Sequence, residues 1–299
     1  MKHISPRLRG TIEISIASMG FGFLGVFGKM AYGAGLSVGE LLSYRFTLAA
    51  ILIWIGLLLF RPQWVRLTGR QLFIAAMLGI FGYAFFSTLY FKAVEGLSIT
   101  LAALLLYTYP FWVNLFSHFF THDKVTRKEL LALLAASFGL VLLLWGHIEI
   151  KDMWAVAAGI GAAISYAIYV MLSGRLQKDV RPVSSALYVI TFGALALCVF
   201  HQPSMSHAME LPTSAATAVI GLAIICTVIP LSLELAALQK LKSNEVALLM
   251  MIEPVTAAIL GAVIFGERLE IQQIIGALII LGALVSNTLR KRDAIHSAQ

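Results

Sequence analysis

The chain has 299 residues, of which 60% are hydrophobic and only 12% are charged, with a formal net charge of +7. Soluble domains are about half apolar and about a quarter charged, so a water-soluble core could not bury this much apolar surface. The composition excludes a soluble protein and predicts an all-α integral membrane protein, because only a helix satisfies its own backbone groups in lipid one segment at a time.

Apolar runs follow one another along the whole chain, separated by charged residues or by Gly, Pro and Ser. A membrane-spanning helix needs about 20 residues. Runs of that length lie at 12–32, 38–60, 71–91, 97–120, 127–146, 153–173, 183–201, 213–236, 244–265 and 270–289. The sequence therefore predicts ten transmembrane helices joined by short connections.

Basic residues predict the orientation of these helices, because Lys and Arg accumulate in cytoplasmic loops. If the N-terminus is cytoplasmic, cytoplasmic segments hold seventeen of the 22 basic residues and the opposite side holds three. We therefore expect both termini to be cytoplasmic, in a bacterial inner membrane. The basic residues are scattered over six short segments, which argues against nucleic acid as a partner and leaves the lipid bilayer and a small-molecule solute.

A pair of apolar runs recurs at an offset of 144 residues. Pro254 and the turn Glu267-Arg268 correspond to Pro110 and the turn Asp123-Lys124. With five helices in each half, the first turn is cytoplasmic and the second faces outward, so the copies are inverted. The sequence thus predicts two inverted five-helix repeats, residues 1–149 and 150–299, with a binding site between them as in many transporters.

Several residues of the second half resemble the closing motif of EamA-type members of the drug/metabolite transporter superfamily: Glu253-Pro254, Gly266-Glu267-Arg268-Leu269, Gln272, Gly276 and Gly282. The first half departs from that motif, with Tyr109 in place of its glutamate and His122-Asp123 in place of Gly-Glu. The resemblance implies a cavity between the halves and a transporter of small organic molecules, frequently an exporter of amino acids or related metabolites.

Glu253 is the first candidate for the solute site, since it lies near the middle of the ninth run. An ionisable group at membrane depth is costly unless it is paired or hydrated. Glu253 could bind a substrate ammonium group or take up a proton; alternatively, it caps backbone groups freed by Pro254 or pairs with a cation. Pro110, Pro230 and Pro254 are expected to kink their helices.

Aromatic and amide side chains at helical spacing are the next candidates for lining a cavity, where the rings would bind an amine-bearing solute through cation–π contacts; ordinary packing is the alternative. They are Tyr83, Tyr90, Tyr107, Tyr109, Trp112, Asn114, Tyr166 and Tyr169. We expect Glu234 and Glu245 to be interfacial.

Three charged residues lie toward the outer ends of the first two helices: Lys29, Glu40 and Arg45. We expect Glu40 to pair with Arg45 or Lys29 through snorkelling side chains, with an external gate as the alternative.

Other patterns carry less weight. Gly20-x-Gly22-x-x-Gly25 follows no strand, so with Gly28 it indicates close helix packing instead of dinucleotide binding. His118 and His122 have metal spacing without further ligands, so neither a metal nor a cofactor is expected, and no catalytic constellation is found.

The sequence favours a monomeric secondary transporter working by alternating access, coupled to protons or to the solute's own gradient. The alternatives are a membrane-embedded enzyme and a lipid-handling protein.

Overall fold

The computed structural model describes residues 5–121, 126–145, 150–176, 178–204, 207–208 and 210–296. Within these ranges the chain is helical between short connections, and its β contact is a single isolated bridge between Leu97 and Ile150. The prediction of an all-α protein is confirmed. The predicted turn His122-Asp123-Lys124 lies outside the described residues.

The first half of the chain forms five helical spans, three of them built from more than one piece. In order these are α1 (Pro6–Gly22) with α2 (Leu24–Gly33); α3 (Val38–Phe60); α4 (Gly69–Met77) with the π-helical η2 (Leu78–Ala84) and α5 (Phe85–Gly96); α6 (Ile99–Leu106) with α7 (Tyr109–Phe116) and the π-helical η3 (Ser117–Thr121); and α8 (Arg127–Leu143). A short 3-10 helix, η1 (Pro62–Trp64), follows α3.

The second half forms five further spans. They are α9 (Met153–Leu176); α10 (Pro182–His201); α12 (Thr213–Ala223) with the π-helical η4 (Ile224–Val228) and α13 (Ile229–Leu238); α14 (Ser243–Leu249) with α15 (Ile252–Phe265); and α16 (Ile271–His296). Nine of the ten spans have at least 18 described residues and are apolar enough to cross a membrane. The tenth, α8, has 17 residues. All ten predicted runs form helices.

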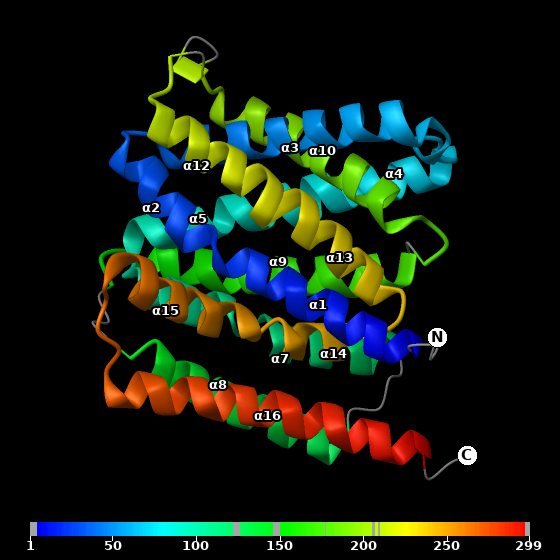
Figure 1. Cartoon of the computed structure of the whole chain (residues 1–299), viewed down its shortest axis with the longest axis vertical. Helices are drawn as coiled ribbons and strands as arrows, with labels where there is room; N and C mark the ends of the chain where they lie inside the picture. Colours follow the sequence, from blue (N-terminus) through cyan, green and yellow to red (C-terminus); the bar gives the residue numbers. More distant parts are fainter. Residues whose placement is uncertain are drawn as a thin grey trace.

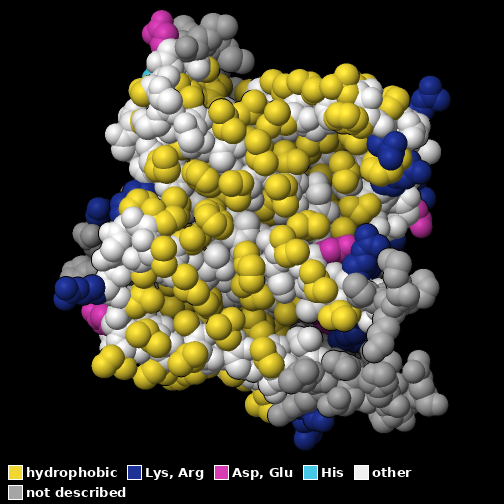
Figure 2. Space-filling model, in the orientation of Figure 1, with side chains coloured by type: hydrophobic (Ala, Val, Ile, Leu, Met, Phe, Trp, Pro, Cys, Tyr) yellow, Lys and Arg dark blue, Asp and Glu magenta, His cyan; other side chains and the backbone are white. Residues whose placement is uncertain are grey.

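The helices lie across the same layer, and both ends of the chain lie at one end of the bundle (Figure 1). On the face shown in Figure 2, hydrophobic side chains cover the middle, while Lys and Arg gather at the two ends of the helices. Large apolar side chains such as Val263 and Leu278 are more than half exposed. This apolar surface between two charged rims is what a bilayer requires of the protein that it surrounds.

Polar residues define where several helices begin and end. Ser37 with Glu40, and Thr68 with Gln71, form capping boxes at the starts of α3 and α4. Gly266 follows α15 with φ of 66°, a left-handed conformation that glycine adopts without steric strain. The connections can therefore be short, which leaves the chain length to the spans.

Glycines allow several helices to approach closely. A Cβ added at Gly20 would lie 2.8 Å from the Ile225 carbonyl oxygen, and one at Gly22 would lie 2.7 Å from the Thr256 Cβ. The expected packing stripe of the first span is therefore confirmed at these two positions. It is wrong for Gly25 and Gly28, which meet no neighbouring helix within 4 Å.

The two halves are interrupted at matching places. Residues 107–108 separate α6 from α7, and residues 250–251 separate α14 from α15. The π-helical segments η2 and η4 also correspond at the 144-residue offset, and π-helical turns are frequent at functional sites. Pro110, Pro230 and Pro254 lie within the first three residues of the helix that follows an interruption, where a missing backbone N–H is tolerated.

Candidate functional site

A cluster of tyrosines fills the middle of the bundle. Tyr109 of α7 meets Tyr166 of α9 with ring centroids 4.8 Å apart, and Tyr166 lies 5.9 Å from Tyr169. Tyr83 of η2 contacts Tyr169 at 5.5 Å. These four side chains are at most 6% exposed. A tyrosine away from the membrane interface needs a polar partner for its hydroxyl, so the cluster marks a polar region inside an apolar bundle.

One such partner is Glu234 of α13, which is completely buried. The Tyr166 hydroxyl donates to Glu234 Oε1 at 3.3 Å. The prediction that Glu234 is interfacial is wrong, because α13 packs against α1, α9 and α10 and its carboxyl points into the core. The sequence contains one signal that Glu234 belongs to the site: the 144-residue offset relates it to Tyr90, which is itself a site candidate.

Glu253 lies at the start of α15, directly after the interruption at residues 250–251, and is half-buried. The Tyr107 hydroxyl is placed to donate to its carboxyl. The charge of Glu253 also acts on Tyr90 and on Tyr109. The first half of the chain thus supplies tyrosines around a carboxylate that comes from the second half.

Arg45 of α3 provides the cation of this region and is only 7% exposed. Its Nε donates to Thr227 Oγ1 and its Nη2 to the Cys226 carbonyl oxygen, both at 2.6 Å. Both acceptors belong to the π-helical η4, and the positive charge of Arg45 also acts on Glu253. The expected Arg45–Glu40 pair is therefore wrong, because the long side chain turns inward to η4.

The other two outer residues have partners of their own. Glu40 caps α3 and accepts from His207 Nδ1 at 2.7 Å. Lys29 pairs with Glu267 at 3.3 Å and lies 4.0 Å from the centre of the Phe265 ring. The expected Lys29–Glu40 pair is also wrong, and Lys29 instead joins the first half of the chain to the second.

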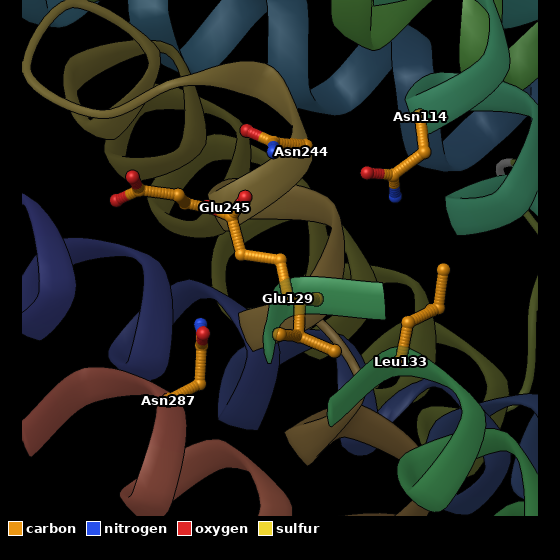
Figure 3. A pocket seen from close by; sticks show the side chains of 7 residues that line it. Asn114, Glu129, Leu133, Asn244, Glu245 and Asn287 are labelled. Atoms are coloured by element: carbon orange, nitrogen blue, oxygen red, sulfur yellow. The ribbon is translucent and has the colours of Figure 1, made fainter. Parts of the chain in front are cut away.

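The described contacts of Asn114 and Trp112 are with residues other than the clustered tyrosines. The Asn114 amide donates to the Pro110 carbonyl oxygen at 2.7 Å, and the Trp112 ring packs against Phe116. Figure 3 shows Asn114 in the wall of a small polar pocket of about 10 Å³. The other lining residues are Glu129, Leu133, Asn244, Glu245, Leu248 and Asn287. A cavity of this size holds about one water molecule, which is too little room for an organic solute.

A larger cavity, of about 280 Å³, reaches the tyrosine cluster from another side. Gly82 and Tyr169 lie in its wall, and its remaining lining is apolar, from Phe73 of α4 to Leu176 of α9. Within the described ranges no three His, Cys, Asp or Glu side chains are placed to hold a metal ion. His122, which has metal spacing with His118, lies outside those ranges.

Comparison with known proteins decides the family. The EamA-like transporter family matches residues 8–145 and, a second time, residues 153–289. The chain belongs to the EamA-like transporter family. The resemblance in the second-half motif is thereby confirmed, and the family covers the first half as well, although Tyr109 departs from the motif there.

Individual relatives of this EamA-like transporter are also transporters. YcbK of Bacillus subtilis, an uncharacterized transporter, is 29% identical over 279 residues, which cover 89% of this chain and 88% of YcbK. RhtA of Escherichia coli K12, a threonine/homoserine exporter, is 28% identical over 244 residues, which cover 78% of this chain and 77% of RhtA. Family and relatives together indicate an integral membrane transporter of small molecules rather than an enzyme.

A solved protein crystal structure has the same fold, with a TM-score of 0.79 over 96% of this chain and 99% of that one. Its sequence identity is 20%, so this similarity concerns the fold alone. The ten-helix architecture with two inverted repeats is therefore shared with a solved protein.

Proposed function

We propose that this EamA-like transporter exports an amino acid, or a closely related amine-bearing solute, by alternating access between two five-helix repeats, residues 1–149 and 150–299. The observation that carries the proposal is the convergence of Glu253 and Arg45 on one tyrosine-lined region. The two residues come from different halves of the chain, and their opposite charges act on one another.

The chemistry of this region suits a zwitterion. The Glu253 carboxylate would accept hydrogen bonds from the solute ammonium group, with Tyr90 and Tyr107 beside it. The Arg45 guanidinium would attract the solute carboxylate, and tyrosine faces favour an organic cation nearby. RhtA, named for the export of threonine and homoserine, supports solutes of this class.

Ion pairs between the halves support alternating access. At the end of the bundle that holds the chain termini, Arg7 pairs with Glu245 at 2.9 Å and Lys240 with Glu13 at 2.7 Å. At the other end Lys29 and Glu267 form a more exposed pair. Pairs at both ends can break in turn, which would open the central site to one side at a time.

The basic residues favour a bacterial inner membrane with both termini in the cytoplasm. A complete inverted pair of repeats can enclose a pathway within one chain, so we propose that the transporter acts as a monomer. Because the sequence contains no phosphate-binding loop, a gradient of the solute or of protons would drive transport.

Transport by purified protein in liposomes tests the function. We expect labelled threonine or homoserine to exchange faster than in empty liposomes, and Glu253→Gln to reduce that exchange about tenfold or more, because the ammonium group loses its charged partner. Labelled amines and nucleosides should exchange more slowly than the amino acids.

Glu95→Gln is the matched control, since Glu95 is an exposed carboxylate that pairs with the likewise exposed Lys92 of its own helix. This variant should exchange solute as the wild type does. If no solute crosses faster than in empty liposomes, the proposed function is wrong. If Glu253→Gln exchanges threonine at the wild-type rate, the proposed site is wrong.

A further inference from the structure

We propose that Glu234 is the binding site of the coupling proton and that it is separate from the solute site at Glu253. This inference rests on the proposed function, since a coupling proton has meaning only in a transporter. It assigns proton binding to one carboxylate and solute binding to the other, according to the groups that surround each of them.

The surroundings of Glu234 favour a neutral carboxylic acid. Its side chain is completely buried, and a single tyrosine hydroxyl donates to Oε1 at 3.3 Å. The other oxygen, Oε2, has no hydrogen-bond partner among the described residues. A buried carboxylate anion is stable only with a cation or several donors around it, whereas a protonated acid is satisfied with less.

Among the described residues, the ionisable groups close to Glu234 bring no positive charge. Four tyrosines act on it electrostatically, and they come from η2, α7 and α9: Tyr83, Tyr109, Tyr166 and Tyr169. Glu253 of α15 is also a charged neighbour, and its like charge further opposes ionisation of Glu234.

The other elements packed against α13 direct their ionisable groups elsewhere. Glu13 of α1 accepts from Lys240, and Glu245 of α14 accepts from Arg7. Tyr188 of α10 donates to the Val65 carbonyl oxygen. Arg45 reaches η4, where a carbonyl and a hydroxyl hold its guanidinium.

Glu253 differs from Glu234 in the groups around its carboxyl. It is half-buried, the Tyr107 hydroxyl can donate to it, and the positive charge of Arg45 acts on it. The donor and the positive charge offset part of the cost of burying the Glu253 carboxylate, and the anion is the form that binds a solute ammonium group. The geometry therefore assigns the solute to Glu253 and the proton to Glu234.

A chain of contacts joins the two carboxylates. Glu234 is held by Tyr166, whose ring lies 4.8 Å from that of Tyr109. The Tyr109 hydroxyl donates to the Ala247 carbonyl oxygen at 3.1 Å, just before the helix interruption that precedes Glu253. When Glu234 loses its proton, its bond from Tyr166 becomes charge-assisted and shorter, so the tyrosines and the interruption must adjust together.

In each transport cycle one solute molecule leaves the cell and one proton enters it. The O–H bond of Glu234 forms with a proton from the outer solution and breaks when the site faces the cytoplasm. At the matching position of the first half stands Tyr90, whose phenol does not ionise near neutral pH. The coupling function would therefore reside in one repeat.

Infrared spectroscopy of the purified protein in liposomes tests proton binding without any solute. We expect a protonated carboxyl stretch at neutral pH that is present in the wild type and in Glu253→Gln and absent in Glu234→Gln. Size-exclusion chromatography and thermal denaturation check that each variant is folded. A carboxyl band that persists unchanged in folded Glu234→Gln would overturn the inference, whatever the transport assays give.

Transport of labelled threonine tests the coupling. We expect Glu234→Gln still to exchange threonine without a gradient faster than empty liposomes do, yet to lose about tenfold or more of the accumulation driven by a pH gradient. Glu234→Asp keeps a carboxyl and should retain part of that accumulation. If the wild type exchanges threonine but Glu234→Gln accumulates it equally well, the proton site is wrong while the proposed function stands.

Discussion

At the residue scale, the buried Arg45 makes a prediction about specificity. Its fork-shaped guanidinium donates to two acceptors in η4, which a lysine ammonium cannot reproduce. In Arg45→Lys we expect the KM for threonine to rise about tenfold, because the solute carboxylate loses a preorganised partner. The half-inhibitory concentration of 1-amino-2-propanol, the same solute without its carboxylate, should stay within about twofold of the wild type.

The amine serves as the internal control of this experiment, because it probes the Glu253 side of the site alone. An unchanged threonine KM in a folded Arg45→Lys variant would show that Arg45 only holds η4 in place. Equal losses for threonine and for the amine would indicate a general distortion of the site.

At the element scale, the crossing of α8 and α16 makes a prediction about stability. An added Cβ at Gly139 would lie 2.7 Å from the Gly276 carbonyl oxygen, so the two helices would have to move apart. We expect Gly139→Ala to destabilise the protein by about 1–3 kcal/mol, the usual range for overpacking. The measurement is the thermal denaturation midpoint in detergent.

Gly282 of α16, the partner helix in this crossing, offers a matched control, since a Cβ there meets nothing within 4 Å. Gly282→Ala should be neutral or stabilising by up to about 1 kcal/mol, because alanine is the better helix former. Similar midpoints for the two variants would contradict the close crossing of α8 and α16.

At the scale of the whole molecule, the distribution of Lys and Arg makes a prediction about topology. Residue 179 lies between α9 and α10, and residue 207 lies between α10 and α12. We expect reporter fusions at 179 to be cytoplasmic and at 207 to be external, since one helix crosses the membrane between them. A fusion after the C-terminus should report the same side as 179. Both internal fusions on one side would contradict the ten-helix alternation.

Much of the fold could be predicted from the sequence, but less of the site. The ten apolar runs coincide with ten helices, because in lipid each segment must satisfy its own backbone hydrogen bonds and a helix does so within one run. The site candidates Glu253, Tyr107 and Tyr109 do lie near one another, since a helix interruption lies beside them in each half. Asn114 was grouped with them by helical spacing, yet its pocket lies elsewhere.

Glu234 and Arg45 show why the rest could not be predicted. The position of Glu234 along its run suggested an interfacial carboxylate, and only the packing of α1, α9 and α10 around α13 encloses it. Arg45 is close to Glu40 along the chain, but its acceptors belong to η4. They are 181 and 182 residues away in the sequence. Such pairings depend on side chains of distant segments meeting in space.

The sequence by itself determined that the chain crosses a membrane as helices, how many times it does so, and to which family it belongs. The first two properties follow from local composition, because lipid solvates each apolar segment separately, whereas the family follows from motif residues such as Glu253-Pro254. Only the tertiary structure decided which carboxylate is enclosed with no cation near it among the described residues, and which one the positive charge of Arg45 acts on. That distinction arises from the low-dielectric contacts between segments, where burial and the nearest charges decide the behaviour of an ionisable group.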